Sequence, residues 1–249
     1  MPFESSPTAP GSRQPPLGLV FDKDGTLIDG DARWFPFARD IVVAAAAGDR
    51  GLERRLADAL GVGRDRLVPN GPAEVASFAE LAVIAGAELA AAGLDPEASQ
   101  DRFARASASA RLGPLRAIGD VRRALSTLAA AGLPLAVATT DDRSTATVDL
   151  AALEIEALLD AVLCGDDDGP VKPDPEVLTG LARAWGHPIE RLWMIGDSIR
   201  DQATATAAGA GFVVVAPGGT RPSWATDAVG VVASVDELPA MVGIDPERP

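Results

Sequence analysis

Residues 20–29 read VFDKDGTLID and place Asp22 and Asp24 directly after the short apolar run 17–21. A fully buried strand has such a run, and Asp-Gly is a common turn dipeptide. The stretch therefore has two interpretations. It is either a solvated turn, the more common case for an acidic cluster, or a metal-dependent site for phosphoryl chemistry. The distribution of polar residues along the rest of the chain favours one of them.

Four further apolar runs resemble the first, and each ends in a polar or glycine-containing segment. The runs cover residues 133–138, 161–164, 192–195 and 212–215, and the segments that follow them cover 139–142, 165–168, 196–198 and 216–219. Helical patterns between the runs cover residues 121–131, 144–153, 175–185 and 199–208. This alternation predicts an α/β fold with a doubly wound, Rossmann-like parallel sheet. In such a sheet ligands bind outside the carboxyl ends of the strands, where all these polar segments fall.

The interval from residue 30 to residue 114 breaks the alternation, because it contains helical patterns and no convincing strand. The helical patterns cover residues 32–47, 52–60, 72–92 and 96–111. A structureless loop of this length is implausible in a compact domain, so we expect residues 30–114 to form an inserted helical cap. The α/β core would then comprise residues 17–29 and 115–249. Residues 1–16 are rich in Pro, Ser and Gly, and predict a disordered N-terminal lead-in.

The composition excludes several classes of function. The chain has 249 residues, of which 47% are hydrophobic and 23% charged, as in globular proteins. Its net charge of -14 argues against nucleic acid or an anionic membrane as a partner. One cysteine excludes an internal disulfide, and one histidine excludes a multi-histidine zinc site. No signal peptide or membrane span is indicated, so we expect a cytoplasmic protein. No sequence feature specifies an oligomeric state.

Taken in order, the polar motifs resemble those of the haloacid dehalogenase superfamily. The motifs are Asp22-x-Asp24-Gly25-Thr26-Leu27, Thr139, Lys172-Pro173 and Gly196-Asp197-Ser198-x-x-Asp201. Within that superfamily the chain is most similar to phosphoglycolate phosphatase-like and β-phosphoglucomutase-like hydrolases, which carry a helical cap in this position. The resemblance spans roughly residues 17 to 240. The joint match outweighs the solvated-turn interpretation, although each motif alone would be weak.

The resemblance implies a role for each aspartate of the first motif. Asp22 would be the nucleophile and would form an aspartyl-phosphate. Asp24 would protonate the leaving oxygen and then activate water. The single residue between them lets both side chains leave the strand end on the same side. Lys23 is a departure, because relatives usually have an apolar residue there.

The remaining motif residues would bind the phosphate and a Mg²⁺ cofactor. Lys172 would neutralise the phosphate, and Thr139 would donate a hydrogen bond to it. Thr26 and Thr140 are further candidates for phosphate contacts, although related phosphatases often have Asn where Thr140 stands. The candidate metal residues are Asp22, Asp24 through its backbone carbonyl, Asp197, and Asp201 as a support of the metal.

Several residues at the start of the cap are further candidates. Arg33 is a weak candidate for a substrate contact. Trp34, Phe35 and Phe37 could line the substrate entrance, although packing within the cap is the favoured interpretation. Asp29 and Asp31 would belong to the hinge between cap and core.

The predicted function is hydrolysis of a small phosphorylated metabolite by a Mg²⁺-dependent phosphatase. A phosphosugar mutase of the same family is an alternative, because the same machinery can return the phosphate to a sugar. A catalytically silent ligand-binding or regulatory module is an alternative of another class, against which the complete motif set argues. Dehalogenation is disfavoured because those relatives lack the second aspartate of the first motif.

Overall fold

A computed structural model describes residues 14–244 of the chain. The predicted N-terminal lead-in falls largely on residues 1–13, which lie outside the described residues. Beside them, Gln14 and Pro15 accept hydrogen bonds from the Arg191 guanidinium. No helix within residues 14–244 is long and apolar enough to cross a membrane.

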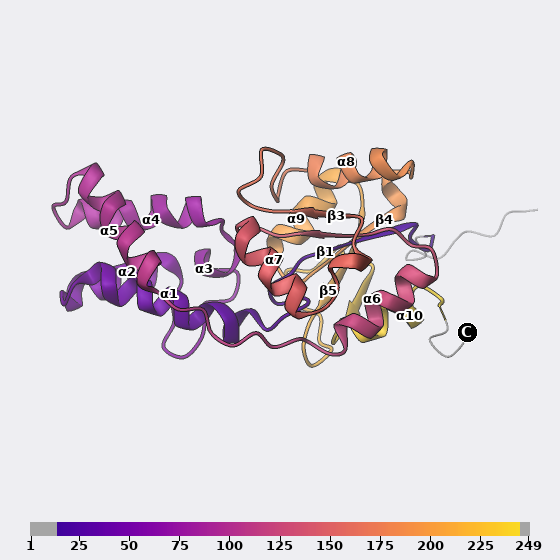
Figure 1. Ribbon diagram of the computed structural model, residues 1–249, viewed down its shortest axis with the longest axis horizontal. Coiled ribbons are helices and arrows are strands. Elements are labelled where there is room, and N and C mark those ends of the chain that lie inside the picture. Colours follow the sequence, from indigo (N-terminus) through magenta and orange to yellow (C-terminus); the bar gives the residue numbers. More distant parts are fainter. Residues whose placement is uncertain (1–13, 245–249) are drawn as a thin grey trace, which may run out of the picture.

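The core contains a six-stranded parallel sheet with the strand order β3-β2-β1-β4-β5-β6 (Figure 1). The strands are β1 (Gly18–Phe21), β2 (Leu135–Ala138), β3 (Ala161–Leu163), β4 (Leu192–Gly196), β5 (Gly211–Val215) and β6 (Gly230–Val232). Strand order reverses at β1, with β2 on one side and β4 on the other, as in a doubly wound fold. The predicted fold class is confirmed, and five strands appear where they were expected. The sixth strand, β6, was not predicted from the sequence.

Helices cover both faces of the sheet. They are α6 (Val121–Ala130), α7 (Arg143–Ala152), α8 (Glu176–Trp185), α9 (Ile199–Ala208) and α10 (Leu238–Met241), with short 3₁₀ helices at Glu156–Leu158, Ile189–Arg191 and Val235–Glu237. Alternate residues of β1 enter opposite apolar clusters: Leu19 and Phe21 pack with α6 and α7, and Val20 packs with α8 and α9. This period of two follows from the alternating direction of side chains along a strand.

Five further helices lie between β1 and α6 in the sequence and gather at one end of the molecule (Figure 1). We call them the cap helices: α1 (Gly30–Ala46), α2 (Arg50–Leu60), α3 (Pro72–Val75), α4 (Phe78–Ala91) and α5 (Pro96–Ser109). They enclose an apolar cluster of their own that includes Leu56, Leu89 and Phe103. The domain limits 30–114 for the cap and 17–29 with 115–249 for the core remain a prediction.

The single helix predicted over residues 72–92 is wrong, because two helices occupy this stretch. The chain is extended at Ala76, with ψ at 151°, and α4 begins after Ser77. The Ser77 side chain accepts a hydrogen bond from the Glu80 amide, and the Glu80 carboxylate accepts one from the Ser77 amide. This capping box satisfies backbone donors at the start of α4 and fixes the break.

Candidate active site

The carboxyl ends of β1, β2 and β4 bring the predicted site residues together. Asp22 follows β1, Thr139 follows β2 and Asp197 follows β4, and these three strands are neighbours in the sheet. The hydrogen bonding between β1 and β4 continues one residue past the end of β1. The Asp22 amide donates to the Ile195 carbonyl of β4 at 2.8 Å. All three side chains, with Lys172, line one cavity of about 800 Å³ that reaches into the cap helices.

Lys172 joins two of the predicted site carboxylates. Its Nζ lies 2.5 Å from Asp22 Oδ1 and 2.7 Å from Asp201 Oδ1, and all three residues are buried. Burial alone would lower the pKa of Lys172, but the charges of Asp201 and Asp22 outweigh it and raise that pKa. Lys172 is therefore a fixed cation at the floor of the cavity.

Asp201 lies behind Lys172 and is absent from the cavity wall. Its second carboxylate oxygen accepts hydrogen bonds from the Ser198 hydroxyl at 2.6 Å and from the Ser198 amide at 3.1 Å. Asp201 thus caps the start of α9 and holds Lys172 at the same time.

Three carboxylates have the spacing of a candidate metal site. One oxygen from each of Asp22, Asp197 and Asp201 lies within 4.8 Å of the other two. Burial raises the pKa of Asp22 to about 7 against the opposing charge of Lys172, and it also raises the pKa of Asp197, with Asp22 adding to the effect. Asp22 Oδ2 is buried and has no hydrogen-bond partner among the described residues. A divalent cation would compensate this crowded negative charge, and Mg²⁺ prefers carboxylate oxygens.

The turn after β1 sets the position of the second aspartate. Gly25 has a φ of 85°, and a Cβ atom there would collide with the Asp197 carboxylate, so only glycine fits. The buried Thr26 donates a hydrogen bond to Asp197 Oδ1 at 3.5 Å. Asp24 is half-buried and lines the cavity, but its carboxylate is outside the three-carboxylate group.

The two threonines after β2 also line the cavity. Thr139 is buried, and its hydroxyl oxygen accepts a hydrogen bond from the Asp141 amide at 3.1 Å, which leaves the hydroxyl proton available to a ligand. Thr140 is half-buried beside it. The turn between Thr139 and Asp141 therefore presents hydroxyl groups to the cavity, as expected for phosphate contacts.

Comparison with known proteins identifies the family. The model of the haloacid dehalogenase-like hydrolases matches residues 17–209, which include every predicted site residue. The chain belongs to this hydrolase family. The predicted family and the prediction of an enzyme are thereby confirmed.

Several curated relatives of this family member are phosphoglycolate phosphatases. The chain is 31% identical over 229 residues to that of Rhodospirillum rubrum, covering 91% of this chain and 89% of the relative. It is 32% identical over 241 residues to the plasmid-encoded phosphoglycolate phosphatase of Cupriavidus necator, and the match covers 92% of this chain and 94% of that relative. A solved structure of a HAD phosphatase from Thermococcus onnurineus has a TM-score of 0.61 at 20% identity, covering 92% of this chain and 99% of that one, and confirms the fold.

The residue that departs from the family pattern, Lys23, is the centre of a buried ion-pair network. Its Nζ lies 2.8 Å from Asp24 Oδ2, 2.8 Å from Asp141 Oδ2 and 2.9 Å from Asp149 Oδ2. Burial alone would lower the pKa of Lys23, but Asp24, Asp141 and Asp149 outweigh it and raise that pKa. Arg33, the weak candidate for a substrate contact, instead binds Asp149 Oδ1 at 2.6 Å. Sequence reasoning missed Asp149, which lies mid-helix in α7 without a motif.

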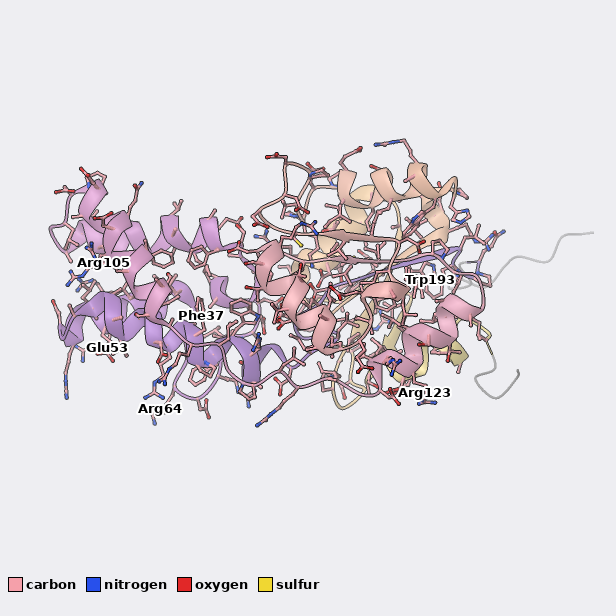
Figure 2. All side chains as sticks on the ribbon, in the orientation of Figure 1. Phe37, Glu53, Arg64, Arg105, Arg123 and Trp193 are labelled. Carbon is pink, nitrogen blue, oxygen red and sulfur yellow. The ribbon has the colours of Figure 1, made fainter. Side chains whose placement is uncertain are left out.

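Trp34 of helix α1 reaches the proposed acid–base residue. Its indole Nε1 donates a hydrogen bond to Asp24 Oδ1 at 2.6 Å, although the sequence favoured packing within the cap. Trp34 and Phe37 both line the cavity, with ring centroids 5.4 Å apart in an edge-to-face arrangement. Phe37 lies among the side chains of the cap helices (Figure 2).

The two hinge candidates have local structural roles at the cavity wall. Asp29 caps α1 by accepting a hydrogen bond from the Ala32 amide at 3.0 Å. Asp31 accepts one from the Leu67 amide at 2.8 Å, which ties α1 to the segment after α2.

Cap and core also contact each other through Arg200, another residue that lines the cavity. The Arg200 guanidinium donates to the Lys172 carbonyl at 2.7 Å and to both Glu80 oxygens at 3.1 Å. The Ile199 amide donates to Asn70 Oδ1 at 2.9 Å. Contacts to α9 thus come from both α4 and the segment before α3.

Proposed function

We propose that the protein is a Mg²⁺-dependent phosphatase that hydrolyses a small phosphorylated metabolite through an aspartyl-phosphate. The observation that carries this proposal is the environment of Asp22. One oxygen is held by Lys172, and the other is buried without a partner among the described residues, in a cavity wall shared with Asp197 and Thr139. A nucleophile, a cation and hydroxyl donors at one point are what phosphoryl transfer requires.

In the first step Asp22 attacks the phosphorus atom, and the bond from phosphorus to the ester oxygen breaks. Lys172 offsets negative charge on the transferring group, and the hydroxyl of Thr139 donates a hydrogen bond to one of its oxygens. Thr140 lies beside Thr139 and is a further candidate for such a contact. Asp24, protonated at this stage, gives its proton to the departing oxygen and leaves it as an alcohol.

In the second step Asp24 takes a proton from a water molecule that attacks the aspartyl-phosphate. Inorganic phosphate is released and the Asp22 carboxylate is restored. Lys23 Nζ and Trp34 Nε1 both contact the Asp24 carboxylate, at 2.8 Å and 2.6 Å, and hold it in position at the cavity wall.

By resemblance to the family, the cofactor would be held by Asp22, Asp197 and the backbone carbonyl of Asp24. Asp201 supports the site from behind through Lys172 and Ser198. When bound, Mg²⁺ supplies positive charge to the phosphate oxygens and offsets the repulsion among the carboxylates. Thr26 would orient Asp197 through its hydroxyl contact.

A variant of the nucleophile tests the proposal. Purified protein should release phosphate from an aryl phosphate in the presence of Mg²⁺, and Asp22→Asn should lower kcat by roughly 10⁴-fold or more because no bond to phosphorus forms. Asp168→Asn is the matched control, since Asp168 is exposed and away from the cavity.

Two outcomes would change the assignment. No Mg²⁺-dependent turnover over a broad panel of phosphate esters contradicts the phosphatase. Transfer of phosphate between positions of a sugar phosphate, dependent on a bisphosphate activator and without release of inorganic phosphate, identifies a mutase instead.

A further inference from the structure

The cavity extends well beyond the residues that handle the phosphate. Its volume of about 800 Å³ lies within the range of roughly 300–1,000 Å³ that holds drug-sized ligands. A phosphate group with a short acidic alcohol, such as glycolate, fills only a small part of it. The cavity therefore has room for a larger alcohol part in the substrate.

The wall of this additional space is apolar and comes from the cap helices and the segment after α2. The side chains that form it include Phe37, Ile41, Leu60, Leu67, Phe78 and Leu81. Phe78 stacks on Phe103, another wall residue, with ring centroids 5.3 Å apart. An apolar ligand that displaces water from apolar surface of this kind binds with a more favourable free energy.

The contact between Trp34 and Asp24 joins the apolar wall to the chemistry. Asp24 is the residue proposed to protonate the leaving oxygen, and Trp34 Nε1 is 2.6 Å from its carboxylate. Trp34 in turn packs edge-to-face against Phe37. Trp34 and Phe37 therefore place an aromatic surface directly beside the proposed acid–base residue.

The charges around the cavity disfavour a second anionic group in this apolar part. On the cap side, Asp31 and Glu74 line the wall as acids. Three arginines also line the wall: Arg66 and Arg116 are exposed and have no side-chain partner among residues 14–244, whereas Arg200 is half-buried and paired with Glu80. An anionic end group is therefore offered an unpaired arginine only at the exposed part of the wall, because Arg200 is already paired with Glu80.

We propose that the preferred substrates are phosphate monoesters of apolar alcohols with a medium-length alkyl or aromatic skeleton, which the cap helices bind by burial. This inference rests on the proposed phosphatase function. It differs from recognition of a short phosphorylated acid, for which the exposed arginines would be the determinants.

A homologous series of primary alkyl phosphates tests the proposal. From ethyl to hexyl phosphate the reacting bond scarcely changes, so a trend in kcat/KM reports on burial of the chain. Each buried methylene should raise kcat/KM about fourfold, as expected from transfer of a methylene out of water. The kcat/KM for hexyl phosphate should also be at least about tenfold higher than that for an alkyl phosphate of the same length whose far end carries a carboxylate. A flat series, or preference for the carboxylate-ended chain or for phosphoglycolate, overturns the proposal.

A cavity-filling variant locates the binding surface. Ala38 lines the cavity on α1, and Ala38→Phe should remove the dependence of kcat/KM on chain length. Val43→Phe on the same helix is the matched control, because Val43 is 50% exposed and away from the cavity. Retention of the chain-length dependence in Ala38→Phe contradicts the proposed surface.

Binding measured without turnover separates this proposal from the proposed function. The affinity of alkylphosphonates, which lack the scissile ester bond, should rise with chain length in titration calorimetry. If that rise is absent while aryl phosphate is hydrolysed, the inference on substrate class fails and the phosphatase stands. If the rise is present and no phosphate ester is hydrolysed, the phosphatase fails and the apolar binding site stands.

Discussion

At the scale of single residues, the most unusual feature is a fully buried lysine that contacts three carboxylates. Lys23 lies between Asp24, Asp141 and Asp149, and Arg33 adds a second cation on Asp149. Burial raises the pKa of Asp141, and the nearby Asp24 raises it further. Lys23 is therefore required to offset the negative charge beside the proposed acid–base residue.

Removal of the Lys23 charge is expected to destabilise the fold. Lys23→Met leaves buried carboxylates without their cation, and should lower the free energy of unfolding by about 3–5 kcal/mol in urea titrations. In a double-mutant cycle, Asp149→Asn should cost less in the Lys23→Met background than in the wild type, because Asp149 has there lost one of its two cations and keeps only Arg33. Strictly additive costs would show that Lys23 and Asp149 do not interact.

At the scale of elements, helix starts and the turn after β1 carry local signals. Asp29 caps α1, Asp95 caps α5, and the Ser77 and Glu80 pair caps α4. The Ser-x-x-Glu pattern at residues 77–80 is visible in the sequence and predicts a helix start there. The prediction of one helix over 72–92 gave more weight to apolar periodicity than to this cap. Strand β6 has no comparable local signal, since its pairing with β5 forms it.

The capping box of α4 leads to a prediction about local stability. Ser77→Ala should lower the stability of α4 by about 1 kcal/mol, because the Glu80 amide loses its acceptor. The measurement is native-state hydrogen exchange of α4 amides, which detects local opening.

Two controls accompany this variant. Ser77→Asp keeps a capping oxygen and should restore most of the protection. Ser109→Ala, near the end of α5, should leave α4 exchange unchanged. Equal exchange in the wild type and in Ser77→Ala would show that the cap contributes nothing to α4.

At the scale of the whole molecule, an acidic chain must bind an anionic substrate. With 36 acidic and 22 basic side chains the net charge is -14, so long-range attraction does not bring a phosphate to the site. Local cations do so instead: Lys172 lines the cavity, and the proposed Mg²⁺ would add charge beside it.

Metal binding should stabilise the native protein measurably. At a Mg²⁺ concentration of about 100 Kd the gain is roughly 2.7 kcal/mol, because only the folded chain assembles the carboxylates. Thermal unfolding with and without EDTA measures it. Asp197→Asn should lose the increase in Tm, and Asp168→Asn should retain it. An increase of the same size in Asp197→Asn would place the metal elsewhere.

The sequence by itself determined the strand–helix alternation, the parallel sheet and the polar residues at the carboxyl ends of its strands. These features follow from apolar periodicity and turn residues, which act over a few positions. Only the tertiary structure decided the environment of those residues. Lys23 and Asp149 are separated by 126 positions, and Lys172 and Asp22 by 150, so their contacts depend on how β1, α7 and the loop before α8 pack. The stretch VFDKDGTLID therefore indicated where the site lies. The packing of the cap helices, which the sequence did not show, determined the shape of its cavity.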